Sequence, residues 1–228
     1  YAIRGVLSVH TQRGRFLAPP QRAILVPPDL PHAVISSPAT EMRSLYIDRS
    51  VIPWAASHCK VLEINPLTRE LISQFGGLPA EYDEHSADGR LVAVLLDQLQ
   101  AAAESGLYLP WPADPRLQPL CEALYEAPDL PHRLGDWASQ LALSEKTLTR
   151  LFQQHTGLTF RAWRQRLRLL SALPLLQQGE RVTDVALACG YDSTSAFIAA
   201  FRKHLGVTPS AFGDLPEHVP QPFSAPQR

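Results

Sequence analysis

The chain has 228 residues and a formal net charge of −1, and 45% of its residues are hydrophobic. This length fits two domains better than one, and the apolar content is high enough to fill folded cores. No apolar run approaches the ~18 residues that a membrane span needs, so we expect no membrane partner. The three cysteines lack metal-ligand spacing and favour a reducing compartment, which predicts a cytoplasmic protein without a disulfide scaffold.

The first 48 residues alternate short apolar segments with turns rich in Gly, Pro and Asp. Strands of ~5 residues in this arrangement are typical of an antiparallel barrel or sandwich. Because Tyr1 already lies inside the first strand, we expect the chain to lack an N-terminal part of this barrel. The predicted strands lie within residues 1–9, 14–18, 22–27, 32–36 and 42–48.

From Asn65 onward the apolar spacing becomes helical. Asn65 followed by Pro66 is a favourable helix start, with the cap and then a proline at the first helical position. A longer helix follows at 87–106, which either packs on its own barrel or forms a dimer seam; its spacing fits both. The next segment is rich in Pro and aromatic residues and predicts a linker at 107–114. The apolar face of the long helix consists of Leu91, Val92, Leu95, Leu96 and Leu99.

The most specific pattern is a helix-turn-helix motif that occurs twice, about 49 residues apart. The copies cover residues 137–157 and 185–206. Each has a short helix, a tight turn, a Ser at the N-cap position, a second helix with buried apolar residues and a final Gly. A helix-turn-helix presents its second helix to the major groove, so two copies predict a sequence-specific DNA-binding protein.

The charge distribution agrees with this division of the chain. Residues 1–132 hold 10 Lys/Arg and 15 Asp/Glu, whereas residues 133–205 hold 10 Lys/Arg and only 5 Asp/Glu. A basic helical segment attached to an acidic domain is typical of a DNA-binding protein with a separate sensing part.

The C-terminal motifs resemble the DNA-binding domain of AraC/XylS-type transcription regulators. The resemblance is carried by ASQLALSEKTLTRLFQQHTG, WRQRLRLL and VALACGYDSTSAFIAAFRKHLGVTPSAF. The segments PPQRAILVPPDLPHAV and MRSLYID are similar to the cupin-like barrel of one branch of that family. The resemblance implies an α+β protein with a cupin-like effector-binding and dimerisation domain at 1–106, the linker at 107–114, two helix-turn-helix units joined by a long helix at 115–213, and a Pro-rich tail at 214–228.

In the first unit, the resemblance places Lys146, Thr149 and Arg150 at the DNA. A guanidinium such as that of Arg150 can donate to O6 and N7 of guanine, which discriminates between bases by ~1–3 kcal/mol. We therefore expect this helix to supply most of the sequence specificity.

In the second unit, the positions expected to face the bases are Thr194, Ser195 and Ala199. Ala199 offers only a methyl group, which can contact a thymine but cannot donate or accept a hydrogen bond. The second helix is therefore expected mainly to position the domain. The predicted contacts to the DNA backbone are Ser144, Ser193, Arg202, Lys203, Arg164 and Arg168.

The resemblance also implies a small-molecule effector in the barrel, whose identity the residues do not reveal. We expect no cofactor. His32 lies in PPDLPH (27–32), which resembles half of a cupin metal signature, but a lone His at a strand end is more often structural, so no metal site is predicted. Beyond operator DNA and the effector, a second copy of the chain and RNA polymerase are candidate partners.

Two other hypotheses stay open from the sequence. One is a metal-dependent cupin enzyme with a helical appendage, which bound metal and the lack of a footprint on genomic DNA would favour. The other is a protein-interaction module whose helix-turn-helix units have lost DNA binding, a hypothesis supported by the neutral residues Ala196, Ile198 and Ala199.

Overall fold

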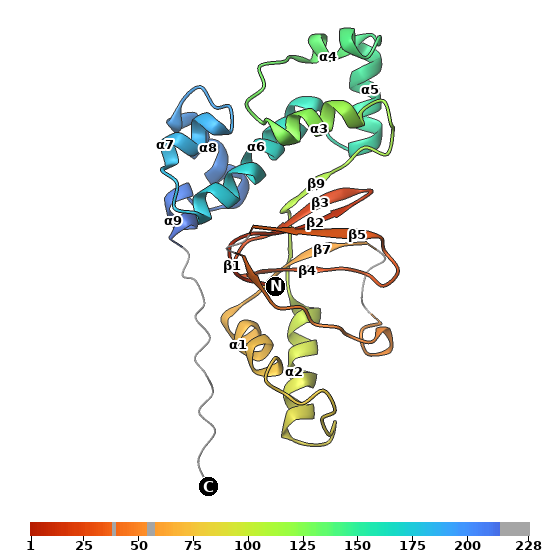
Figure 1. Ribbon diagram of the computed structural model, residues 1–228, viewed down its shortest axis with the longest axis vertical. Coiled ribbons are helices and arrows are strands. Elements are labelled where there is room, and N and C mark those ends of the chain that lie inside the picture. Colours follow the sequence, from red (N-terminus) through yellow and green to blue (C-terminus); the bar gives the residue numbers. More distant parts are fainter. Residues whose placement is uncertain (38–39, 54–57, 215–228) are drawn as a thin grey trace.

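The computed structural model in Figure 1 describes residues 1–37, 40–53 and 58–214. Antiparallel strands occupy the centre of the molecule, two helices extend from one end of it, and the C-terminal helices form the other end. The fold is α+β, as the sequence predicted. The Pro-rich tail predicted at 214–228 lies, except for Asp214, outside the described residues.

The N-terminal half contains antiparallel strands and two helices, which confirms the β-rich domain predicted there. The strands are β1 (Ala2–Arg4), β2 (Leu7–Thr11), β3 (Gly14–Ala18), β4 (Arg22–Leu25), β5 (His32–Ser36), β6 (Glu41–Met42), β7 (Lys60–Glu63), β8 (Glu104–Ser105) and β9 (Tyr108–Pro110). One sheet has the order β5-β2-β3-β9, a second has the order β4-β7-β8, and β1 pairs with β6.

The hairpin of β2 and β3 places side chains on two faces of its sheet. Its turn is held by the Thr11 hydroxyl, which accepts the backbone N–H of Gly14 at 3.1 Å. Val9 lies opposite Phe16, and both side chains are buried in the core. Successive residues of a strand point to opposite faces, so the neighbouring pair of His10 and Arg15 lies on the other face.

The two helices after β7 pack on each other and on the sheet. Asn65 caps α1 (Pro66–Phe75), and its side chain accepts the N–H of Thr68 at 2.8 Å. The second helix, α2 (Ala87–Ala101), is shorter than predicted because residues 104–105 pair as β8 with β7. Leu95 and Leu99 of α2 are buried in one cluster with residues of α1 and β7. The helix therefore packs on its own chain and does not offer these two leucines to a second copy.

The segment predicted as a linker is part of the sheet. Within residues 107–114, β9 pairs with β3, with Leu109 opposite Arg15. Leu107, Leu109 and Trp111 are all buried. The two halves of the molecule are thus joined by a packed strand, because the alternating apolar residues of this segment complete the sheet.

From residue 115 to residue 214, the end of the described chain, the regular elements are all helices. They are α3 (Gln118–Glu126), α4 (Leu134–Gln140), α5 (Glu145–Thr156), α6 (Phe160–Gln177), α7 (Val182–Ala188), α8 (Thr194–Leu205) and α9 (Pro209–Gly213). In Figure 1, α6 runs from the α3–α5 group to the group of α7, α8 and α9.

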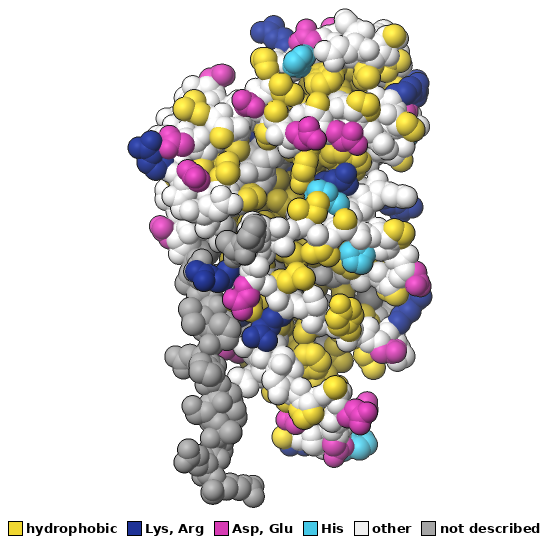
Figure 2. All heavy atoms as spheres, viewed as in Figure 1, with side chains coloured by type: hydrophobic (Ala, Val, Ile, Leu, Met, Phe, Trp, Pro, Cys, Tyr) yellow, Lys and Arg dark blue, Asp and Glu magenta, His cyan; other side chains and the backbone are white. Residues whose placement is uncertain are grey.

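A single apolar cluster extends through both halves. It includes Val9 and Phe16 of the sheet, Trp111 after β9, and Trp163 and Phe201 of the helices. Figure 2 shows apolar side chains along the middle of the molecule, across the boundary between the sheet and the helices. Because burial of apolar surface drives association, this shared core holds the two halves together.

Candidate nucleic-acid interface

The first helix-turn-helix unit consists of α4 and α5. The turn between them closes when the backbone N–H of Leu143 donates to the Ala138 carbonyl at 2.9 Å, with Ala142 in the left-handed region at a φ of +52°. Ser144 then caps α5, and its hydroxyl accepts the N–H of Thr147 at 3.1 Å. One face of α5 is buried in the core through Leu148, Leu151 and Phe152. The opposite face is thereby presented outward.

The second unit, formed by α7 and α8, repeats these features. Its turn is closed by the N–H of Tyr191, which donates to the Ala186 carbonyl at 2.9 Å, and Gly190 takes the left-handed position at a φ of +75°. Ser193 caps α8 by accepting the N–H of Ala196 at 3.2 Å. The turn of the second unit has one residue more before its capping serine than the turn of the first unit. Ser144 and Ser193 are therefore 49 residues apart, whereas Ala138 and Ala186 are 48 residues apart.

The outward face of α5 gathers the residues that the sequence placed at the DNA bases. Lys146, Thr149 and Arg150 are exposed and line one shallow groove together with Gln153 and Gln154. The Thr149 hydroxyl donates to the Glu145 carbonyl at 2.8 Å, so it remains able to accept a hydrogen bond. Amide, hydroxyl, ammonium and guanidinium groups along one helix face are the groups that read base edges in the major groove. Gln154 escaped the sequence analysis, although its position four residues after Arg150 places it on the same face.

The outward face of α8 is chemically plainer. Ser195 and Ala199 are exposed and Thr194 is half-buried, so all three predicted positions reach the surface. Between them lie Ala196 and Ile198, which are also exposed. Basic side chains are found only in the last turn, where Arg202 and Lys203 are exposed. The first two turns of α8 therefore carry no charged side chain.

Two predicted backbone contacts on α6 have partners inside the protein. Arg164 donates to the carbonyls of His132 and Leu130, and the Arg168 Nε donates to the Pro128 carbonyl at 3.1 Å. Both side chains are half-buried and hold the loop before α4 against α6. We therefore leave Arg164 and Arg168 out of the proposed interface, because these hydrogen bonds direct both guanidinium groups toward the protein's own loop.

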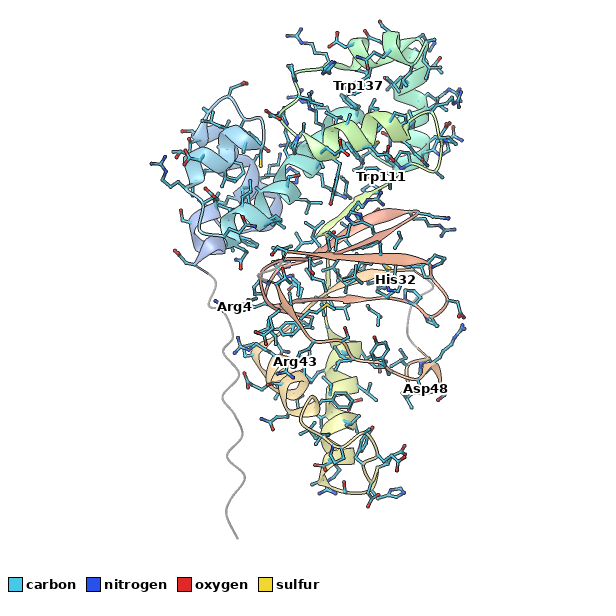
Figure 3. The ribbon with its side chains drawn as sticks, in the orientation of Figure 1. Arg4, His32, Arg43, Asp48, Trp111 and Trp137 are labelled. Carbon is cyan, nitrogen blue, oxygen red and sulfur yellow. The ribbon has the colours of Figure 1, made fainter. Side chains whose placement is uncertain are left out.

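The sheet half presents no cluster of metal ligands among the described residues. His32 is exposed, and its Nδ1 lies 2.8 Å from the Leu30 carbonyl. Figure 3 places His32 on the sheet and Trp111 where β9 enters the helical half. Within residues 1–37, 40–53 and 58–214, no helix combines the length and the apolar character that crossing a bilayer requires.

Comparison with known proteins decides the family. Residues 1–146 match the AraC-like ligand binding domain, and residues 137–214 match a helix-turn-helix domain. The chain belongs to the AraC family of DNA-binding transcription regulators. It is 35% identical over 211 residues to the HTH-type transcriptional regulator NimR of Escherichia coli, an alignment that covers 92% of this chain and 77% of NimR.

Other relatives of this AraC-family regulator match mainly in part. The HTH-type transcriptional regulator RipA of Corynebacterium glutamicum is 34% identical over 103 residues, which is 45% of this chain and 31% of RipA. Among solved structures, an AraC-type transcriptional regulator from Chromobacterium violaceum is 30% identical, with a TM-score of 0.41, and covers 45% of this chain and 95% of its own. Because the two family models that match this chain are a ligand binding domain and a helix-turn-helix domain, the cupin-enzyme hypothesis is set aside.

Proposed function

We propose that this AraC-family regulator reads its operator mainly through α5. Lys146 and Arg150 donate to base edges in one major groove, and Thr149 contributes a hydroxyl beside them. The observation that supports this assignment is the shared groove of these three exposed side chains, on a helix whose opposite face is fixed in the core. Side chains whose supporting helix is rigid lose little freedom on binding, which favours specificity.

In the same proposal, α8 occupies a neighbouring groove and contributes little discrimination. Thr194, Ser195 and Ala199 face the bases, and Arg202 and Lys203 bind phosphates. The N-terminal ends of α5 and α8, at Ser144 and Ser193, add backbone N–H groups toward phosphates, since helix N-termini attract anions. The joining helix α6 sets the spacing of the two contacts.

The ligand-binding half is proposed to make operator binding respond to a small molecule. A second copy of the chain and RNA polymerase are the remaining partners in this proposal. We also propose a cytoplasmic location, in keeping with a DNA partner and three free, buried cysteines.

The test is recovery of bound fragments from sheared genomic DNA, followed by sequencing. The full chain is expected to enrich a small set of promoter fragments that share a motif. Arg150→Ala is expected to lose this enrichment, while Arg90→Ala, a change on α2 at the far end of the molecule, keeps it. Enrichment that is the same for the full chain and Arg150→Ala would contradict the assignment of α5.

A salt titration tests the phosphate contacts. The logarithm of operator affinity is expected to fall with the logarithm of salt concentration by ~0.9 for each phosphate bound, giving a slope of several units in total. A flat profile would contradict the proposed basic surface.

A further inference from the structure

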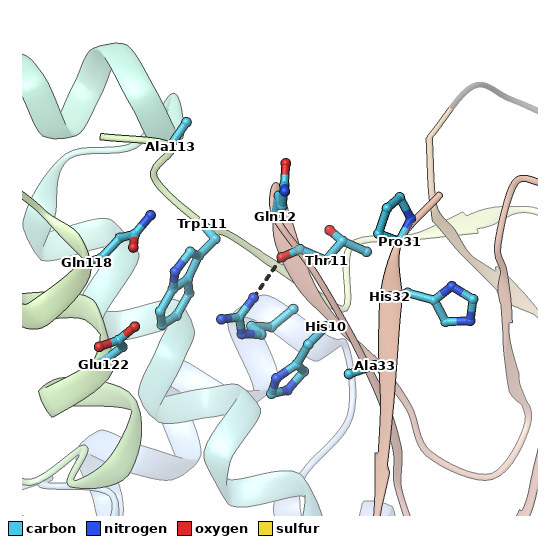
Figure 4. A pocket seen from close by; sticks show the side chains of 11 residues that line it. His10, Thr11, Gln12, Pro31, His32, Ala33, Trp111, Ala113, Gln118 and Glu122 are labelled. Atoms are coloured by element: carbon cyan, nitrogen blue, oxygen red, sulfur yellow. Dashed lines mark hydrogen bonds between the residues drawn. The ribbon is translucent and has the colours of Figure 1, made fainter. Parts of the chain in front are cut away.

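A hollow lies between the two halves of the molecule. Its volume is about 720 Å³, and Figure 4 shows side chains of the sheet on one side and of α3 on the other. Small-molecule sites have volumes of ~300–1,000 Å³ and occur preferentially at domain interfaces. The walls used below are His10 of β2, Arg15 of β3, Ala33 of β5, Trp111 after β9, and Gln118 and Glu122 of α3.

Arg15 supplies a fixed positive charge in this hollow. Its guanidinium carbon lies 4.0 Å from the centre of the Trp111 ring, and its Nη1 donates to the Thr11 carbonyl at 2.8 Å. Trp111 and His10, which are labelled in Figure 4, line the hollow together with Arg15. Among the described residues no carboxylate forms an ion pair with Arg15. A half-buried guanidinium held in this way, with further donors unused, is suited to an anion with two oxygens.

The other walls fit an organic body attached to that anion. Burial, with the charge of Arg15, lowers the pKa of His10 to about 4, so the ring is neutral at physiological pH. The His10 Nε2 lies 3.0 Å from the Tyr125 hydroxyl of α3, which fixes the ring in place. Ala33 and Trp111 supply apolar surface, and the Gln118 amide supplies a donor and an acceptor.

We propose that this hollow binds a small organic carboxylate, which pairs with Arg15 and touches the sheet and α3 at once. Glu122, exposed at the α3 side, repels negative charge, so the carboxylate of the ligand must lie at Arg15 and away from this residue. The site differs from a cavity enclosed by the strands alone, because both halves of the chain form its walls.

The segment that forms one wall of the hollow continues along the chain to a contact with α5. Asp114 follows Trp111 and Ala113 along the chain, and its carboxylate accepts from Arg116 at 2.6 Å and lies 3.7 Å from the His155 Nε2 near the end of α5. A ligand that shifts this segment acts on α5 through direct contacts. This regulatory consequence rests on the proposed function, whereas the binding site does not.

The first experiment compares benzoate with benzamide by calorimetry on the full chain. The two molecules have similar shapes and differ in charge. Benzoate is expected to bind at one site, and benzamide about tenfold or more weakly, because hydrogen bonds to a charged group are the stronger ones. Arg15→Gln is expected to remove the preference for benzoate, and Arg13→Gln, an exposed arginine two residues away, is expected to keep it. Equal binding of the two compounds, or no binding of benzoate up to its solubility limit, would overturn the proposal.

Arg15 also packs on Trp111, so its replacement can disturb the fold of the site. A second pair of variants therefore changes the charge of the site at Gln118 of α3 and leaves Arg15 in place. Gln118→Lys is expected to strengthen benzoate binding and Gln118→Glu to weaken it, in each case by several-fold, since like charges repel and unlike charges attract. If the benzoate affinity of both variants changes in the same direction, or of neither, benzoate binds elsewhere and the proposed site is wrong.

Operator binding without benzoate separates this proposal from the proposed function. Both Gln118 variants are expected to bind operator DNA as the unchanged chain does. Operator binding without a benzoate site would overturn only the present inference, and a benzoate site without operator binding would overturn only the proposed function. If the chain both binds operator DNA and has the benzoate site, benzoate is expected to change operator affinity more in the unchanged chain than in Gln118→Glu.

Discussion

The two helix-turn-helix units have the same interior and different exteriors. In both, an Ala carbonyl closes the turn, a Ser caps the second helix, and a left-handed Gly, Gly157 or Gly206, ends it. The exteriors share little, because α5 presents Lys146 and Arg150 where α8 presents small neutral residues. Packing therefore fixes the placement of a recognition helix, while the residues on its outer face are free to determine what it recognises.

The largest effects are expected from the shared interior. Phe152 and Phe197 are both fully buried, so Phe152→Ala and Phe197→Ala should each lower the free energy of unfolding by ~3–5 kcal/mol. Urea unfolding followed by circular dichroism measures both losses. A loss below ~1 kcal/mol in only one of them would break the equivalence of the two interiors.

The exteriors are compared by replacing one arginine in each unit. Arg150→Ala should weaken operator binding by ~1–3 kcal/mol and binding to random DNA much less, because base contacts carry the discrimination. Arg202→Ala should weaken both about equally, as expected for a phosphate contact. Fluorescence anisotropy with both DNAs at one salt concentration measures the four affinities. The opposite pattern would assign sequence reading to α8.

Exchanging Ala and Gly at the left-handed position of each helix-turn-helix turn is expected to change stability in opposite directions. Ala142 holds a left-handed φ that costs an L-residue ~1–2 kcal/mol, so Ala142→Gly should stabilise the first unit, less the entropy that glycine loses on folding. Gly190→Ala should destabilise the second, since the added Cβ would lie 2.7 Å from the Asp129 Cα. Thermal unfolding of the two variants measures the signs. A fall in stability for Ala142→Gly would contradict the first expectation.

The smallest expected effect concerns acid stability and comes from Asp114, whose carboxylate lies 3.7 Å from His155 of the first unit. Hydrogen bonds from Arg116 lower the pKa of Asp114 from 3.8 to about 2, so this carboxylate stabilises the folded state above pH 3.8. That contribution is lost as the pH falls toward 2, because the unfolded chain then binds the proton more readily. Asp114→Asn should flatten the fall in stability over this interval. Urea midpoints at pH 5, 4, 3 and 2.5 provide the measurement, with Asp184→Asn in the second unit as the comparison.

Local patterns were sufficient to predict the starts of several helices. Asn65, Ser144 and Ser193 each cap the helix that the sequence assigned to them, because a cap is a contact within three residues. The exposed placement of Lys146 and Arg150 likewise follows from helical periodicity.

Features that depend on distant contacts were missed. The segment 107–114 has the prolines of a linker, yet β9 completes the sheet because β3 offers an unpaired edge. Arg164 is a basic residue next to the two motifs, which made a DNA contact the natural prediction. The fold shows instead that it donates to the carbonyls of Leu130 and His132. The hollow at the junction joins Arg15 to Gln118, which no local pattern can bring together.

The indole of Trp163, near the start of α6, donates to the Pro110 carbonyl at the end of β9 at a distance of 2.7 Å. The ring is fully buried, so a rotation of the sheet that leaves this bond intact must turn α6 with it. Since α6 joins the two units, such a rotation would change the orientation of both α5 and α8 about the contact between Trp163 and Pro110. A signal from the sheet would then change the alignment of the pair on the duplex, and a promoter with altered spacing between its two half-sites should respond to it differently.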